Sequence, residues 1–556
     1  MADGDAAEFD TVIVGAGSAG SVLAARLSEE AGRRVLLLEA GPRDRSWRIH
    51  MPAAVGSLIS NHRFNWNFVS DPEPFLDGRR LTHPRGRVLG GSSSINGMMY
   101  IRGHALDYDA WVAQGLGGWA YADVLPYFRR AEHHLLGGDR YHGGSGPLGV
   151  CAPDLAQAAL AQRFVEAGLQ AGYGHASDVN GERQEGVGRM DRTTLGGRRC
   201  SAARAYLWPA AGRSNLVIRT GVQVRRILLE GGRASGVQYR DAGGTLAVAT
   251  AGEVIVAAGA IGSPQLLQLS GIGPPDLLRG LSVPVRHELP AVGENLNDHP
   301  DLAVQHRCRE PLSLYGVNHG LARLATGLRW FLRADGPAAS NHFEAGAFLR
   351  SRAGILHPDI QLTFMPLAIR PGTVRDVGCH SFQVHIDLLR PRSLGRVALR
   401  SADPAEPPSI VFNYLSHPED RTDLRQAVRL TREILAQPAL DAVRGEELNP
   451  GVAVTSDAAL DAWIRQGVET CYHPVGTCRM GLSPRDSVVD AHGRVHGVPG
   501  LRVIDASIMP GIVSGNTNAP VIMMAEKLSD DILGRPSLEP VNAPVWIHPA
   551  WASAQR

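Results

Sequence analysis

Residues 9–41, FDTVIVGAGSAGSVLAARLSEEAGRRVLLLEAG, contain the pattern that decides the fold. The β-branched run TVIVG precedes a glycine-rich turn. After the turn, SVLAARLSEE has the helical spacing of apolar residues, and RVLLLEAG is typical of a second buried strand. The order strand, glycine turn, helix, strand predicts a βαβ unit.

The glycine turn carries a nucleotide-binding fingerprint. Gly15, Gly17 and Gly20 form GxGxxG, and Glu39 ends the next predicted strand, 19 residues after Gly20. Gly15 permits the tight turn, Gly17 lets the backbone approach a pyrophosphate, and Gly20 allows close packing. The helix N-terminus offers free N–H groups to phosphate, and Glu39 can accept hydrogen bonds from ribose hydroxyls. The fingerprint predicts a dinucleotide site but does not distinguish FAD from NAD.

Later segments repeat the strand-then-helix pattern. EVIVAAG, at residues 253–259, is typical of a buried strand, and the following helix is expected to begin with Ser263 as N-cap and Pro264 in its first turn. LRVIDASIMP, at 501–510, predicts a third buried strand before a closing helix at 518–533. Because these strands are scattered along the chain, we expect one discontinuous domain.

Residues 310–469 differ in pattern and are predicted to form a second domain. Period-2 stretches such as SFQVHIDLL alternate with helical segments such as DLRQAVRLTREILAQP, which indicates a mixed antiparallel sheet with helices. The expected fold class is therefore α/β (α+β overall), with a discontinuous Rossmann-type domain and a second, sheet-plus-helices domain. The predicted boundaries are 8–309 for the main part of the first domain, 470–535 for its return, and 536–556 for a Pro-rich tail.

Composition narrows the class of protein. The chain has 556 residues, of which 44% are hydrophobic and 20% charged, as in soluble globular proteins. Lys+Arg number 56 and Asp+Glu 55, so the net charge of +1 gives no reason to expect a nucleic acid partner. No Cys/His cluster has metal-ligand spacing, and no metal is expected.

The cysteines and the N-terminus indicate the compartment. The six cysteines lie far apart and are expected to be reduced thiols of a cytoplasmic protein. The N-terminus MADGDAAEFD lacks a basic region followed by an apolar one, so no signal peptide is expected. No run of about 18 apolar residues occurs, which predicts no membrane span and leaves peripheral contact with the inner membrane open.

Four motifs together resemble one enzyme family. They are RGRVLGGSSSINGMMYIRG at 85–103, GAIGSPQLLQLSGIGP at 259–274, CYHPVGTCRMG at 471–481 and VSGNTNAP at 513–520. In this order they resemble the glucose–methanol–choline (GMC) family of FAD oxidoreductases, from Phe9 to about Leu533. NWNFVSDPEPF and YIRGHALDYDAW look most like bacterial choline dehydrogenases, although alkanol dehydrogenases of the family share much of this wording.

The resemblance implies that FAD binds across the N-terminal unit and under a loop at 85–103. Small residues suit that loop, because large side chains would block its approach to the flavin and phosphates. The residues expected to contact the cofactor are Gly15, Gly17, Ser18, Ala19, Gly20, Glu39, Ala40, Arg87, Val88, Gly90, Gly91, Ser92, Asn96, Gly97, Met98, Val224, Ala258, Gly259, Asp505, Ala506, Asn518 and Pro520. Some relatives attach FAD covalently through a histidine of this loop. Ile95 stands there in this chain, which predicts non-covalent FAD.

His473 and Asn516 match the family's catalytic positions. Alcohol oxidation requires loss of the hydroxyl proton and transfer of a carbon-bound hydride to flavin N5. A neutral imidazole suits the first task, because its ordinary pKa of about 6.5 lies near working pH. The resemblance therefore implies that His473 is the base and that the Asn516 amide holds the substrate oxygen. On local residues alone, His473 could equally be a structural histidine.

Candidate substrate contacts are Glu344, with its neighbour Phe343, and Trp66. A quaternary ammonium such as that of choline requires aromatic faces and a carboxylate. Glu344 also fits a buried ion pair, and Trp66 also fits a core position. The sequence thus predicts oxidation of a primary alcohol, choline or similar, to the aldehyde.

Alternatives remain open on the sequence. They are a broad-specificity aliphatic or aromatic alcohol dehydrogenase, and a non-redox hydroxynitrile lyase of the same fold. The subfamily resemblance also favours a quinone-type electron acceptor.

Overall fold

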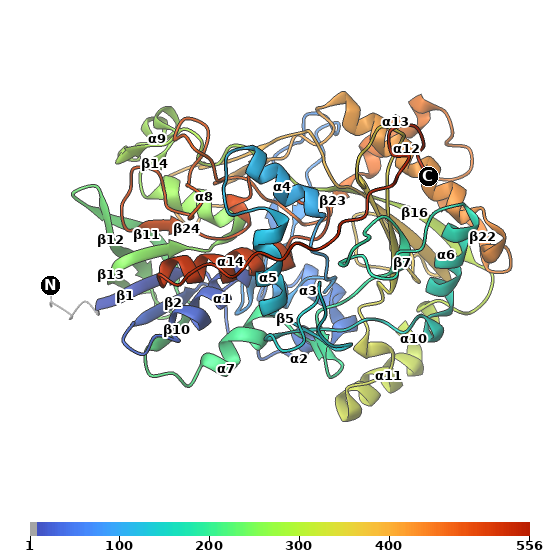
Figure 1. Cartoon of the computed structure of the whole chain (residues 1–556), viewed down its shortest axis with the longest axis horizontal. Helices are drawn as coiled ribbons and strands as arrows, with labels where there is room; N and C mark the ends of the chain where they lie inside the picture. The colour runs from blue at the N-terminus through green and yellow to red at the C-terminus, as the bar shows by residue number, and fades with distance from the viewer. Residues whose placement is uncertain (1–7) are drawn as a thin grey trace.

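A seven-stranded sheet built on the βαβ unit occupies one end of the molecule (Figure 1). The computed structural model describes residues 8–556. The strand order is β10-β2-β1-β13-β12-β11, and β24 pairs with β13. The bounds are β1 Glu8–Val14, β2 Val35–Glu39, β10 Leu216–Thr220, β11 Gln223–Glu230, β12 Arg233–Arg240, β13 Leu246–Val256 and β24 Leu501–Val503. The first three of these strands, with β13 and β24, run parallel, which confirms the predicted discontinuous parallel sheet.

Helices from both ends of the sequence cover this sheet. α1 (Ser18–Leu27) packs against α14 (Asn518–Ile532), and α14 packs against α5 (Tyr121–Ala131). The carboxylate of Glu526, on α14, accepts hydrogen bonds at 2.8–2.9 Å from one arginine of α1 and one of α5. The closing segment of the chain is thereby fixed to the first βαβ unit.

A second seven-stranded sheet forms the other end of the molecule, and its strands pair antiparallel. Its order is β22-β16-β19-β18-β17-β7, with β23 paired to β16. The bounds are β7 Gly186–Arg189, β16 Pro300–Cys308, β17 Ala345–Leu349, β18 Ile360–Met365, β19 Ser381–Leu388, β22 Arg444–Asn449 and β23 Glu469–Thr470. The predicted boundary at residue 310 is therefore wrong. β7 and β16 precede it in sequence but belong to this sheet, because pairing between strands far apart in the chain leaves no local signal.

Further helices surround the two sheets. They are α2 Trp47–His50, α3 Gly56–Ile59, α4 Ala105–Ala113, α6 Ala159–Gln170, α7 Trp208–Ala210, α8 Gly259–Leu269, α9 Pro275–Gly280, α10 Tyr315–Asn318, α11 Gly320–Arg333, α12 Pro418–Leu435 and α13 Asp457–Gly467. α11 extends from the body of the molecule at one edge (Figure 1).

Helix α8 begins one turn earlier than the sequence predicted. It starts at Gly259, and Pro264 lies inside it. Ser263 is not the N-cap. Its hydroxyl instead donates to the carboxylate of Asp505, which also accepts from the Gly259 N–H at 2.8 Å. The helix start is thus fixed by a carboxylate 246 positions further along the chain.

Residues 536–556 cross the surface from the first domain to the second (Figure 1). The Val541 N–H donates to the Ala122 carbonyl at 2.9 Å, and the Trp546 N–H donates to the Glu182 carbonyl at 2.8 Å. At the end of the chain, Arg556 pairs with Glu433 of α12. The predicted tail is thus an ordered extension that contacts both domains.

Three expectations about location meet the structure in different ways. Within residues 8–556, no helix has both the length and the apolar content that crossing a bilayer requires. All six cysteines are free thiols. The expectation that no signal peptide is present rests largely on residues 1–7, which lie outside the described residues.

Candidate active site

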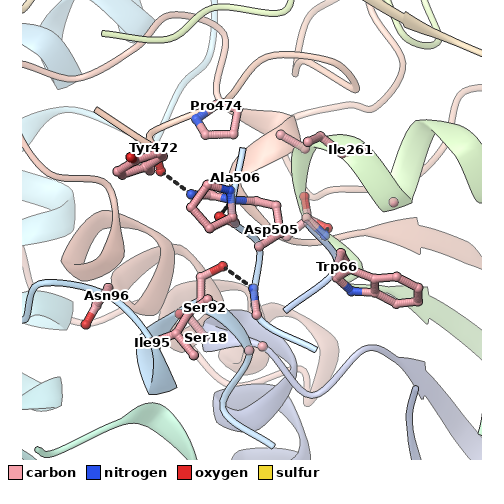
Figure 2. A pocket seen from close by; sticks show the side chains of 18 of the residues that line it. Ser18, Trp66, Ser92, Ile95, Asn96, Ile261, Tyr472, Pro474, Asp505 and Ala506 are labelled. Carbon is pink, nitrogen blue, oxygen red and sulfur yellow. Dashed lines mark hydrogen bonds between the residues drawn. The ribbon is translucent and has the colours of Figure 1, made fainter. Parts of the chain in front are cut away.

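A cavity of about 490 Å³ lies between the two sheets, a size typical of cofactor and ligand pockets. Its lining comes from the βαβ unit, the 85–103 loop, α8, the second sheet, and the loops at 470–474 and 505–521. Figure 2 shows Ser18, Ser92, Ile95 and Asn96 on one side of the cavity and Tyr472 and Pro474 on the opposite side.

The fingerprint forms one end of the cavity. Gly15, Gly17, Ser18, Ala19, Glu39 and Ala40 all line it. No side chain caps the N-terminus of α1, so its N–H groups face the cavity as an anion site. The carboxylate of Glu39 accepts from the backbone N–H groups of Ala16, at 2.9 Å, and Gly41, at 2.8 Å. Burial raises the pKa of Glu39 to about 7.

The 85–103 loop places small residues against the fingerprint. Gly91, Ser92, Asn96, Gly97 and Met98 line the cavity, together with Ile95. A Cβ added at Gly91 would lie 2.6 Å from Cα of Gly17, and Gly91 has φ +53. Only glycine fits this close approach of loop and fingerprint. The donor set and the narrow backbone passage fit the diphosphate of a dinucleotide.

Residues further along the chain complete the cofactor side. Val224, Ala258, Gly259, Asp505, Ala506 and Asn518 line the cavity. Asn518 Oδ1 accepts from the Ser18 hydroxyl at 2.7 Å, which joins the start of α14 to the start of α1. Burial raises the pKa of Asp505, whose carboxylate accepts from two backbone N–H groups.

Five predicted cofactor contacts lie behind the cavity wall. Gly20, Arg87, Val88, Gly90 and Pro520 are not part of its lining. A Cβ at Gly20 would lie 1.9 Å from the Gly15 carbonyl oxygen, so Gly20 supports the turn by close packing. The guanidinium of Arg87 covers the ring of Trp66 at 5.0 Å, and the Gly90 N–H donates to the Ala16 carbonyl. For these five residues the prediction of direct contact is wrong, because they support the residues that line the cavity.

His473 lies at the end of a chain of hydrogen bonds that fixes its protonated nitrogen. Nε2 of His299 is 3.0 Å from the Leu389 carbonyl, which can only accept, so this nitrogen carries the proton. Nδ1 of the neutral His299 therefore accepts from Nδ1–H of His473, at 3.0 Å. The lone pair of His473 is left on Nε2, which accepts from the Asn516 amide Nδ2 at 3.0 Å.

Burial keeps both histidines neutral. It lowers the pKa of His299 to about 4. The pKa of His473 lies well below its usual value because of burial, His299 and the Arg85 guanidinium. Gln361, on β18, donates to Oδ1 of Asn516 at 3.3 Å and orients the amide. The arrangement is that of a general base beside a hydrogen-bond donor.

The backbone around His473 is also held in place. The His473 N–H donates to Asp298 Oδ1 at 2.7 Å. The preceding Tyr472 has φ +66, which is uncommon for a non-glycine residue, and Arg85 donates to its carbonyl at 2.6 Å. Such strain is often retained where it sets the direction of a functional side chain.

The predicted substrate contacts separate in the structure. Phe343 and Trp66 line the cavity, whereas Glu344 does not. Oε1 of Glu344 accepts from the Ser340 hydroxyl at 2.5 Å and lies 4.0 Å from Arg192. The buried ion-pair interpretation of Glu344 therefore fits the structure, and its prediction as a substrate contact is wrong.

Sequence reasoning missed the acidic groups that do face the substrate side. Asp301, His385 and Asp387 line the cavity, and Asp301 stands directly opposite Asp387 in the β16–β19 register. His385 Nδ1 lies 2.9 Å from Asp301 Oδ2. Burial opposes protonation of His385, but Asp301 outweighs it and the pKa of His385 is raised. Burial and the charge of Asp301 raise the pKa of Asp387 well above its usual value, which favours a neutral carboxyl there.

Comparison with known proteins identifies the family. Models of the GMC oxidoreductase family match residues 9–301 and 391–525. The chain belongs to this family, as the four motifs predicted, and the prediction of an FAD oxidoreductase is confirmed.

Among curated relatives, the chain is similar to the oxygen-dependent choline dehydrogenase of Photobacterium profundum. The two are 50% identical over 551 residues, or 99% of this chain and 97% of the relative. It is 51% identical to the protein of the same name from Pseudomonas aeruginosa, over 96% of both chains.

Solved structures with the same fold act on different substrates. Pyridoxine 4-oxidase from Mesorbium loti has a TM-score of 0.85 and 34% identity, covering 95% of this chain and all of its own. Formate oxidase has a TM-score of 0.89 and 26% identity, covering 95% and 99%. The fold therefore does not specify the substrate, which must be inferred from the cavity.

Proposed function

We propose that this protein oxidises a primary alcohol, choline, to the aldehyde with FAD as cofactor. The observation that carries the proposal is the fixed tautomer of His473. Its unprotonated Nε2 faces the Asn516 amide inside a cavity whose other end fits a dinucleotide. The similarity to choline dehydrogenases over nearly the whole chain supports the substrate.

The residues of the chain perform the proton transfer. The substrate hydroxyl enters between the two side chains, donates to Nε2 of His473 and accepts from Nδ2 of Asn516. His473 takes the hydroxyl proton, and the amide stabilises the alkoxide as negative charge develops on oxygen. FAD bound at the fingerprint supplies the acceptor for the hydride that leaves the alcohol carbon.

The choline cation is proposed to lie beside Asp301. A carboxylate and aromatic faces are the groups that favour a quaternary ammonium, and Asp301 shares the cavity lining with Phe343 and Tyr472. Asp301 and His385 neutralise each other when no cation is present, so the carboxylate is not left buried and unpaired. These residues replace Glu344 in the role that the sequence suggested.

The test compares choline with 3,3-dimethylbutan-1-ol, which has the same shape but no charge. Loss of oxidised-flavin absorbance is followed anaerobically after mixing. Faster bleaching by choline supports a cation site. Equal rates would favour the alternative, an enzyme for uncharged aliphatic or aromatic alcohols. Bleaching by no alcohol would favour the hydroxynitrile lyase, to which the oxidases and dehydrogenases named above give no support.

Replacement of Asp301 sharpens this test. Asp301→Asn should raise the apparent KM for choline at least tenfold and leave that for the neutral isostere within about twofold, because only the cation loses a charge partner. Glu344→Gln is the matched control and should not discriminate between the two alcohols. A similar loss for both alcohols in the Asp301 variant would contradict the assignment.

The electron acceptor is proposed to be a quinone. Oxygen is the alternative, because the relatives' names specify oxygen dependence. Choline-dependent reduction of a soluble ubiquinone analogue without oxygen, compared with oxygen uptake in its absence, distinguishes the two acceptors.

We further propose a cytoplasmic location with peripheral contact at the inner membrane, and non-covalent FAD. The six free thiols support a reducing compartment, and the hydrocarbon side chain of Ile95 cannot form a bond to the flavin. Acid denaturation should release all yellow colour from the polypeptide. Flavin that remained attached would contradict non-covalent binding.

A further inference from the structure

Helix α11 exposes a continuous apolar stripe. Leu321, Leu324, Leu328, Phe331 and Leu332, which we name the α11 surface, are 53–83% exposed. They follow the i, i+3, i+4, i+7 spacing that places side chains on one helical face. Scattered exposed leucines need no explanation, but a contiguous stripe usually marks an interaction site.

The stripe points away from the protein. At about 100° per residue, Trp330 lies on the side of the helix opposite Leu321. Trp330 is 1% exposed, and its indole N–H donates to the Gly197 carbonyl at 2.8 Å. The single buried anchor of the helix therefore holds it with the apolar face outward, where no described residue covers most of it (Figure 1).

Aromatic and basic groups border the stripe. The ring of Trp47, 42% exposed on α2, packs edge-on against Phe331 at 5.7 Å. The Arg48 guanidinium lies over the Trp47 ring at 4.9 Å. An exposed tryptophan beside arginines is typical of groups at a membrane–water interface, where one end is apolar and the other hydrated.

The charge on the helix favours one kind of partner. α11 contains Arg323, Arg329 and Arg333 and no acidic residue. Asp335, just beyond the helix, pairs with Arg329 and leaves the other two arginines without a partner among the ion pairs of the described residues. Apolar residues on one face and arginines on the rest are the features of helices that lie in the surface of an anionic bilayer.

We propose that the α11 surface docks this enzyme on an anionic lipid bilayer. The inference rests on the membrane contact proposed above and identifies the residues that make it. In the docked state the leucines and Phe331 enter the acyl boundary, while Arg323 and Arg333 lie at the headgroups. The docked enzyme would also have its cavity near the bilayer. Trp47 begins the segment that continues through Val55 and Ile59, both of which line the cavity.

The test measures co-sedimentation of the flavin-loaded enzyme with vesicles. Vesicles of phosphatidylcholine with phosphatidylglycerol are compared with vesicles of phosphatidylcholine alone. We expect binding to the anionic vesicles only, and weaker binding at about 0.5 M salt. Leu324→Glu with Leu328→Glu should lower the partition at least tenfold. Val452→Glu with Leu482→Glu is the matched control, because these side chains are 77% and 72% exposed elsewhere.

Flavin content and alcohol-dependent bleaching should be unchanged in both double variants, which shows that they fold. Absence of binding by the wild type, or equal binding by the α11 variant, would overturn the proposal. A wild-type dimer that the α11 variant converts to a monomer, without vesicle binding, would assign the surface to a second copy of the chain instead. If vesicles bind but choline does not bleach the flavin, the proposed function fails while the docking surface stands.

Discussion

His299 should control the rate of oxidation through the tautomer of His473, although it makes no contact with the substrate. In the His299→Leu variant, Nδ1–H of His473 loses its acceptor and the Leu389 carbonyl loses its donor. The proton of His473 is then free to move to Nε2, the nitrogen that must receive the substrate proton. We expect a lower kcat/KM, with FAD still bound.

The size of the effect follows from the one hydrogen bond that selects the tautomer. A buried donor left without its acceptor costs about 1–3 kcal/mol. Since about 1.4 kcal/mol corresponds to a tenfold change in rate, the expected loss is about 10- to 100-fold. Most of it should appear in the rate of flavin bleaching at saturating alcohol rather than in KM, because His299 acts on the base and not on binding.

The matched variant is His299→Gln. A glutamine amide offers one acceptor and one donor, as the neutral imidazole does here, so it can accept from His473 and donate to Leu389. We expect it to recover most of the rate lost in His299→Leu, as followed by anaerobic stopped-flow. Equal losses in both variants would show that His299 acts only by packing, and no loss in His299→Leu would refute the reasoning.

Three further predictions concern other parts of the site. His473→Ala should retain FAD and lose alcohol-dependent bleaching by about 100-fold or more, and near-normal bleaching would contradict its role as base. Gly91→Ala should lower flavin content per chain, whereas Gly78→Ala, which meets no atom within 4 Å and also has positive φ, should not. The kcat/KM for choline should increase as pH rises through the raised pKa of His385, because the imidazolium that neutralises Asp301 is then lost. The neutral isostere should show no such increase.

Local patterns were sufficient for the cofactor end of the molecule. The strand, the three glycines and Glu39 lie within one short segment, and their roles follow from backbone geometry that glycine alone permits. The start of α8 could not be predicted in the same way. Asp505, far along the chain, supplies the carboxylate that Ser263 and the Gly259 N–H bind.

The error at Glu344 has a simple geometric cause. Successive side chains of extended backbone point to opposite sides. Phe343 lines the cavity, and Glu344, at the next position, points to Ser340 and Arg192 instead. The sequence placed the right segment at the site, but the side that each residue faces depends on how β17 is oriented in the sheet.

The substrate side depends on a tetrapeptide, residues 298–301, that no motif singled out. Asp298 binds the backbone N–H of His473, and His299 sets its tautomer. Asp301, two positions after His299 and on the same face of the chain, provides the carboxylate opposite Asp387. One strand start therefore fixes both the base and the proposed cation contact, so the distance between them is set by about two residues of extended backbone. A rigid spacing of this kind selects alcohols by the separation of hydroxyl and charge, a property that only the fold of β16 against the His473 loop makes visible.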